Sequence, residues 1–211
     1  MKTDNPVFVW MGRLGDLVGL NLLFLVCCLP IFTMGASATA LFYTARKLLD
    51  GECVSLPKTF FHSFRQNFAQ ATAVFLVLLA VGALAAVDLI FGFRTPGASG
   101  NLFRGIGFGL GLVWLMVLTY IFALLSRYEY RTGALVYGAF LTALTHPMET
   151  LAGLCLILLM PALAWFNTNA FFYLLLPYLL MGPALSAIIV SVLLRPVFRQ
   201  MEEKKEENAH V

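Results

Sequence analysis

The chain alternates between long apolar runs and short segments that hold nearly all of its charges. One run contains a single charged residue, Asp88, and three others contain none. The runs cover residues 69–93, 105–125, 150–166 and 171–194. A helix of about 20 apolar residues crosses the hydrocarbon core of a bilayer, so these runs predict an integral membrane protein. With a further apolar run at 14–32, the pattern predicts an all-α, polytopic bundle of about five transmembrane helices.

The segments between the runs predict which side of the membrane each loop occupies, because Lys and Arg accumulate in cytoplasmic loops. Five spans would place ten of the fourteen Lys and Arg residues on one side: Arg46, Lys47, Lys58, Arg65, Arg127, Arg131, Arg195, Arg199, Lys204 and Lys205. The opposite side would hold Lys2, Arg13, Arg94 and Arg104. This bias predicts a cytoplasmic C-terminus and an external N-terminus.

The first apolar run leaves two arrangements open. Residues 14–49 form either one span followed by a surface helix, or a re-entrant hairpin broken at Pro30. The hairpin would return the N-terminus to the cytoplasm and leave four full spans. A cleaved signal peptide is disfavoured, because the helical pattern continues to Leu49 and a loop rich in basic residues follows.

A segment on the predicted cytoplasmic side has the pattern of an amphipathic helix. Its aromatic residues recur at helical spacing: Phe60, Phe61, Phe64 and Phe68. Lys58, His62 and Arg65 occupy the rest of the surface, as expected for a helix lying on a membrane. A helix that docks on a partner protein would show the same pattern.

A weak internal repeat is also suggested, since a shift of 80 residues pairs Phe60 with Phe140 and Phe64 with Leu144. In both places an amphipathic segment leads into two apolar runs. Shared membrane patterning explains this equally well.

Composition supports membrane residence and excludes several functions. Hydrophobic residues make up 60% of the chain and charged residues 12%, against roughly 45–50% and 25% in soluble domains. The net charge of +3 is spread over several loops and favours no nucleic-acid partner. The four cysteines lack the spacing of a zinc site, so we expect free thiols and no metal or cofactor. Residues 1–199 are predicted to form one transmembrane domain, and 200–211 a charged, disordered cytoplasmic tail.

Few polar residues lie within the apolar runs. Asp88 is five residues from the end of its run, close enough to the interface for Arg94 or Arg104 to pair with it. Arg13 and Asp16 are spaced for an ion pair on one helix, and Asn21 is placed to hydrogen-bond another span.

Glycines recur four residues apart in the run at 105–125 and predict close helix packing, not a nucleotide loop. The two pairs are Gly105 with Gly109 and Gly107 with Gly111. No nucleophile or paired carboxylates accompany the histidines, so we expect no enzymatic activity.

Three blocks of residues together resemble the YesL-like family of bacterial integral membrane proteins, whose biochemical activity is not established. The first block contains Arg13-Leu14-Gly15-Asp16, Asn21-Leu22-Leu23, Leu29-Pro30-Ile31-Phe32-Thr33-Met34-Gly35-Ala36 and Thr39-Ala40-Leu41. The second is Leu125-Ser126-Arg127-Tyr128-Glu129, and the third is Val197-Phe198. The resemblance implies a multi-span protein of the bacterial cytoplasmic membrane, often encoded beside carbohydrate-uptake genes. It implies no catalytic residues.

Two functional hypotheses follow. The first is a non-enzymatic accessory or regulatory protein that binds another membrane complex, such as a carbohydrate transporter, through its cytoplasmic surface. Its candidate contacts are Phe61, Phe64, Arg65, Arg127 and Glu129. The second is a small-molecule permease whose path lies between two helical hairpins and uses Asn21, Asp88 and the breaks at Pro161, Pro177 and Pro183.

Overall fold

The computed structural model describes residues 6–52, 55–128, 131–196 and 199, and this part of the chain is helical throughout, without strands. The predicted tail at 200–211 lies outside the described residues. The helices in chain order are α1 (Pro6–Cys28), η1 (Ile31–Thr33), α2 (Met34–Leu49), α3 (Leu56–Arg94), α4 (Ala98–Leu125), α5 (Thr132–Thr145), α6 (Pro147–Phe166) and α7 (Thr168–Leu193). The predicted all-α fold is confirmed.

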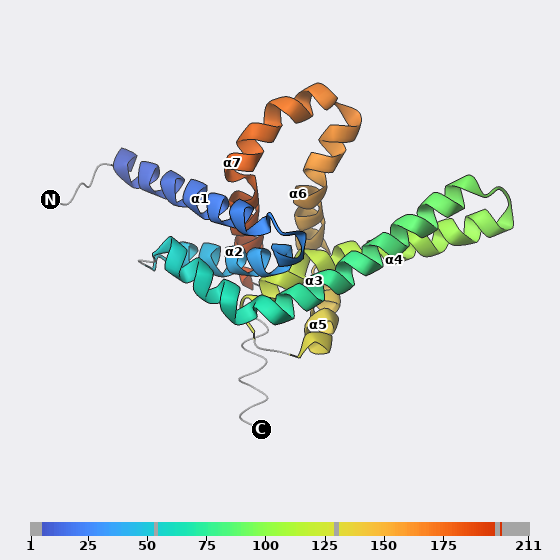
Figure 1. Ribbon diagram of the computed structural model, residues 1–211, viewed down its shortest axis with the longest axis horizontal. Coiled ribbons are helices and arrows are strands. Elements are labelled where there is room, and N and C mark those ends of the chain that lie inside the picture. Colours follow the sequence, from blue (N-terminus) through green and yellow to red (C-terminus); the bar gives the residue numbers. More distant parts are fainter. Residues whose placement is uncertain (1–5, 53–54, 129–130, 197–198, 200–211) are drawn as a thin grey trace.

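The first two helices form an antiparallel hairpin (Figure 1). α1 ends at Cys28, two residues before Pro30, as expected because proline disfavours the helical conformation of the residue before it. The chain then reverses through the short η1 helix and returns as α2. Of the two arrangements left open for residues 14–49, the structure therefore has the hairpin. The start of α1 lies at the same end as the α2–α3 connection (Figure 1).

α3 and α4 form a second, longer hairpin that extends away from the rest of the molecule (Figure 1). Both helices are long and apolar enough to cross a membrane. We call their paired outer parts the α3–α4 arm. α3 also contains the predicted amphipathic segment, which is continuous with the span and not a separate surface helix. The helix changes direction near the start of its apolar run (Figure 1).

The last three helices contain the remaining apolar runs. α7 is a third helix of membrane-spanning length, whereas α5 and the first part of α6 meet at an angle of 104° across His146. Three described helices therefore meet the length and composition of a span, or four if this bent pair counts as one. Of the other two predicted spans, the one at 150–166 lies in α6 and counts only together with α5, and the one at 14–32 is divided by the turn after Cys28, which leaves the shorter apolar segment Leu14–Cys28.

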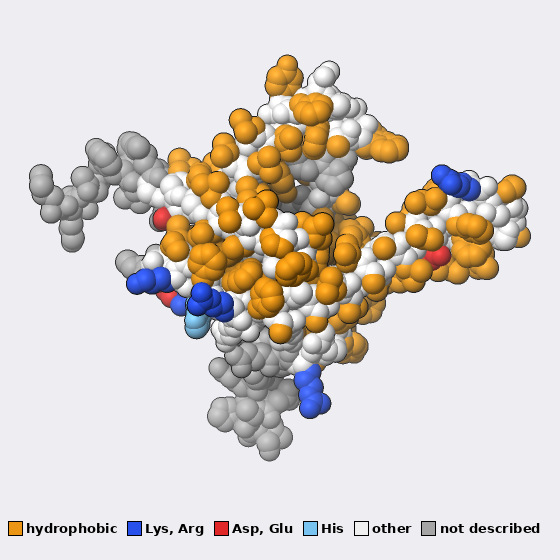
Figure 2. All heavy atoms as spheres, viewed as in Figure 1, with side chains coloured by type: hydrophobic (Ala, Val, Ile, Leu, Met, Phe, Trp, Pro, Cys, Tyr) orange, Lys and Arg blue, Asp and Glu red, His pale blue; other side chains and the backbone are white. Residues whose placement is uncertain are grey.

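The buried core lies where the hairpins meet. It includes the part of α3 that follows the amphipathic segment and the C-terminal ends of α4 and α7. One cluster contains Tyr120, Ile121 and Leu194, and a second joins Leu20 and Phe60 to small residues of α2 and α7. We call this end of the molecule the base. Apolar side chains cover much of the face seen in Figure 2, and the charged groups on this face lie at the base and near the tip of the α3–α4 arm. This distribution is typical of a membrane protein.

Candidate functional site

Asn21 is a fully buried polar side chain of α1, and it hydrogen-bonds α7 at the point where a proline interrupts that helix. Pro183 has no amide hydrogen, so the carbonyl of Leu179, one turn earlier, has no helical donor. Asn21 Nδ2 donates to this carbonyl oxygen at 2.5 Å, and Asn21 Oδ1 accepts a hydrogen bond from the Ala184 amide at 3.2 Å. Asn21 is fully buried. The predicted hydrogen bond to another span is therefore confirmed, and it leaves this side chain little capacity to bind a substrate.

The turn between α1 and α2 is stabilised by Thr33 and closed by Gly35. Thr33 Oγ1 lies 2.5 Å from the Cys27 carbonyl oxygen and 2.6 Å from that of Pro30, and shares its proton between them. These bonds satisfy carbonyls that the end of α1 leaves unpaired. A methyl group on Gly35 would lie 2.6 Å from Phe75 Cβ and would meet the Ala71 carbonyl oxygen of α3. Pro30, Thr33 and Gly35 thus serve the reversal of the chain and its close packing.

Two further polar links in the interior were not anticipated from the sequence. Trp114 of α4 donates to the carbonyl oxygen of Leu78 in α3 at 2.6 Å. The Tyr120 hydroxyl lies 2.8 Å from Thr150 Oγ1, which is 2.7 Å from the carbonyl oxygen of His146 at the bend between α5 and α6. The only sequence signal for these links is the presence of hydrogen-bonding side chains within apolar segments, where each must find a partner.

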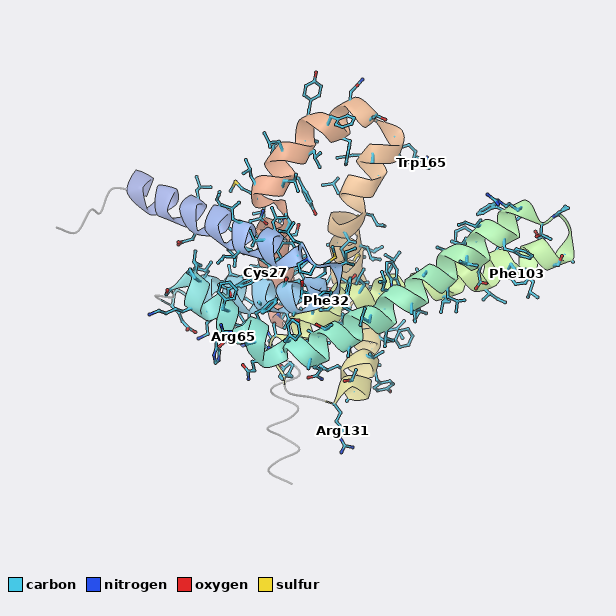
Figure 3. The ribbon with its side chains drawn as sticks, viewed as in Figure 1. Cys27, Phe32, Arg65, Phe103, Arg131 and Trp165 are labelled. Atoms are coloured by element: carbon cyan, nitrogen blue, oxygen red, sulfur yellow. The ribbon has the colours of Figure 1, made fainter. Side chains whose placement is uncertain are left out.

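The amphipathic start of α3 divides its aromatic residues between core and surface. Phe60 is fully buried and stacks on the half-buried Phe64, with ring centroids 6.3 Å apart. Phe61 and Phe68 are 39% and 36% exposed. The expectation that all four rings face the membrane or a partner is therefore wrong, because Phe60 and Phe64 pack on α1 and α2. Arg65 is exposed and points away from the body of the molecule (Figure 3).

Asp88 lies half-buried near the tip of the α3–α4 arm. The predicted pairing with Arg104 is not found: Arg104 Nε donates to the Gly92 carbonyl oxygen at 2.9 Å, and its guanidinium lies over the Phe93 ring at 5.2 Å. In the part of the chain that the structure describes, Asp88 forms no ion pair.

Of the four glycines in the two pairs of α4, only one lies in close contact with another helix. A methyl group on Gly107 would lie 2.9 Å from Leu89 Cγ, so this glycine permits the contact with α3. Gly105, Gly109 and Gly111 have open space at the position of a Cβ atom. The expectation of close packing is wrong for these three, because the spacing does not show which side of α4 faces α3.

At the base, ion pairs connect neighbouring segments. Arg195, after α7, pairs with Asp50, after α2, at 2.9 Å, and Lys47 pairs with Glu52 at 2.8 Å. The hydrogen bond to Glu52 raises the pKa of Lys47.

Three of the predicted contacts at this end have different outcomes. Glu129 and the side chain of Arg13 lie outside the described residues. Arg127 is described and interacts with another residue of the protein. Asp16 is exposed, unlike the buried Asn21, and lies at a 490 Å³ cavity between α1, α2 and α7. The predicted pair of Arg13 with Asp16 stays a prediction.

Within the described residues, no group of three or more His, Cys, Asp and Glu side chains is arranged to hold a metal ion. The described polar groups instead connect helices: Asn21 to α7, Trp114 to α3, and Tyr120 to α6. These three hydrogen bonds support the packing of the helices.

Comparison with known families yields one match. Residues 17–89 are similar to the family described as "Protein of unknown function, DUF624". The matched segment runs from α1 to Leu89 of α3, and therefore includes Asn21, Thr33, Gly35 and Asp88. The match is consistent with the YesL-like family and confirms that the chain resembles a family of uncharacterised proteins. The predicted blocks at 125–129 and 197–198 lie outside the DUF624 match. Searches among curated proteins and among solved structures find no match.

Proposed function

We propose that the protein is a non-enzymatic accessory component of the bacterial cytoplasmic membrane, and that it docks within the bilayer onto another membrane complex. A carbohydrate importer is the partner that the family resemblance favours. In this proposal α3, α4, α6 and α7 cross the membrane, the α1–α2 hairpin enters it from the cytoplasm, and the base faces the cytoplasm.

The observation that carries the proposal is Asp88 on the α3–α4 arm, which forms no ion pair with any residue that the structure describes. The arm exposes large apolar side chains, and these can be covered equally well by lipid or by protein. It also exposes Gly105 and Gly109, which have open space beside them. Lipid chains cannot satisfy a carboxylate. A partner helix with a basic side chain would neutralise Asp88, and the small glycine face would let that helix approach closely. We therefore propose the arm as the docking surface in preference to the amphipathic start of α3, where Phe60 and Phe64 pack in the core.

The test is co-purification from native membranes in mild detergent. Wild type is expected to retain a membrane partner, whereas Asp88→Asn and Gly109→Leu are expected to lose most of it. Gly111→Leu is the matched control, because it places the same side chain in open space on a different side of α4. Equal recovery of the partner with Gly109→Leu and Gly111→Leu, or no partner with wild type, contradicts the proposal.

A permease remains the second candidate because of one partly open cavity between helices. It has a volume of about 220 Å³ and lies between the α1–α2 hairpin and helices α4, α6 and α7. Its walls are mostly apolar, with hydroxyl groups from Thr119, Tyr178 and Ser186. Such a lining between helices is typical of small-molecule sites. Asp88 does not line this cavity, which removes it from the predicted path.

Reconstituted vesicles separate the two candidates. A permease alone would move a sugar or an ion across the vesicle membrane, and Ser186→Leu, which narrows the cavity, would slow that transport. An accessory protein would leave the vesicles inert across the same panel while its co-purification stays sensitive to Asp88→Asn.

A further inference from the structure

The first turns of α3 carry a surface cavity whose lining is basic. Its volume is about 710 Å³, and it is lined by Pro57, Lys58, Phe61, His62, Arg65 and Gln66. These residues recur at helical spacing along one face, and none is a carboxylate. Basic side chains gather at this end of the molecule in Figure 2. The chemistry of the cavity therefore suits an anion.

The cations of this cavity have no acidic partner among the described residues. Lys47 and Arg195, also at the base, each form an ion pair with a carboxylate. Lys58 and Arg65 form none in the part of the chain that the structure describes, and both are exposed. Their charges are thus available to a ligand. An arginine can bind phosphate through two parallel hydrogen bonds, and a lysine adds a mobile point charge.

The position of the cavity relative to the membrane indicates that the anion is a lipid headgroup. α3 continues without interruption into the apolar run that starts at Ala69, so Arg65 lies about 6 Å along the axis before that run. The polar headgroup layer is about 5–8 Å thick on each side of the hydrocarbon core. The bend in α3 turns its first part away from the direction of the span (Figure 1), which keeps Lys58 closer to the same layer.

Phe61 provides the apolar part of the same face. Its ring is 39% exposed and lies between the cations in the cavity lining. An exposed ring beside Lys and Arg is the pattern of a helix held in the headgroup region, with its apolar side among the acyl chains.

We propose that Lys58, His62 and Arg65 bind the phosphate of an anionic phospholipid headgroup, with Phe61 packed against the lipid beside it. This site would fix the depth and tilt of the base at the cytoplasmic surface, where anionic lipids attract basic side chains. Lipid binding at this site does not require a protein partner, so its test is independent of the test of the proposed docking function.

The test measures lipid binding to the purified full-length chain in mild detergent by native mass spectrometry. The probes are phosphatidylglycerol, phosphatidylcholine and inorganic phosphate. Wild type is expected to bind phosphatidylglycerol in preference to phosphatidylcholine, and excess inorganic phosphate is expected to displace little of it. Lys58→Gln with Arg65→Gln should weaken phosphatidylglycerol binding by about fivefold for each cation removed.

The matched control is Arg131→Gln with Arg199→Gln, which removes the same charge from exposed positions outside the cavity lining. This control should keep the affinity of wild type. Equal loss in both double variants would mean a general surface charge effect and would overturn the proposal. So would complete displacement by inorganic phosphate. Loss of a co-purifying acidic protein in the Lys58/Arg65 variant, without change in lipid binding, would assign the face to a protein and overturn it as well.

Discussion

At the scale of single residues, the interior polar groups act as links between helices. Asn21 illustrates how such a link arises from sequence. A carboxamide side chain in an apolar helix must find partners for its NH2 group and its carbonyl oxygen inside the protein, and a proline in another helix creates an unpaired carbonyl. Asn21 bonds this carbonyl, that of Leu179, and also the Ala184 amide. The need for a partner was predictable from Asn21 alone. The identity of the partner was not, because it depends on how α1 and α7 are aligned.

Replacement of Asn21 by Leu is expected to lower the free energy of unfolding by about 1–3 kcal/mol, since the Leu179 carbonyl would be left unsatisfied in an apolar environment. Pro183→Ala restores an amide donor to this carbonyl. The double variant Asn21→Leu/Pro183→Ala should therefore be more stable than the sum of the single effects. Thermal unfolding in detergent measures both. Strict additivity of the two substitutions would show that Asn21 and Pro183 are not coupled.

At the scale of elements, the lengths of the helices were easier to predict from the sequence than the directions in which the chain turns between them. The apolar runs at 69–93 and 105–125 lie within α3 and α4. The first contains only Asp88 as a charged residue and the second contains none, and so little charge over that length has few alternatives to a span. The reversal after Cys28 was one of two arrangements left open, because Pro30 marks a break without showing whether the chain turns back. The 104° bend at His146 could not be derived, because it depends on contacts with other helices. Thr33 holds the reversal, and Tyr120 and Thr150 link α4 to the bend.

Close packing of α2 on α3 depends on the absence of a side chain at Gly35. Gly35→Ala is expected to lower the melting temperature, because the added methyl group would meet backbone of α3, which cannot move as a flexible side chain can. Gly105→Ala is the matched control. Its methyl group enters open space, so the higher helix propensity of alanine should leave stability unchanged or slightly raised. A Gly35→Ala variant as stable as Gly105→Ala would contradict the packing described for α2.

At the scale of the whole molecule, the α1–α2 hairpin changes the expected topology. Both ends of this hairpin lie together, so the start of α1 shares a side with the end of α2 (Figure 1). If α3, α4, α6 and α7 are the spans, only Arg94 and Arg104 of the fourteen Lys and Arg residues lie on the opposite side. This bias is stronger than the one that five spans produce, and it favours cytoplasmic positions for both termini.

Thiol labelling in intact cells tests this topology. All four native cysteines are first replaced by alanine, and single thiols are then introduced by Asn5→Cys, Ser99→Cys and Arg199→Cys. A membrane-impermeant reagent is expected to label only the Ser99→Cys variant, in the first turn of α4, because the proposed topology assigns the other two positions to the cytoplasm. After permeabilisation all three should react. Labelling of Asn5→Cys from outside would require α1 to cross the membrane alone, which is incompatible with an α2 that returns beside it, and would restore five spans with an external N-terminus.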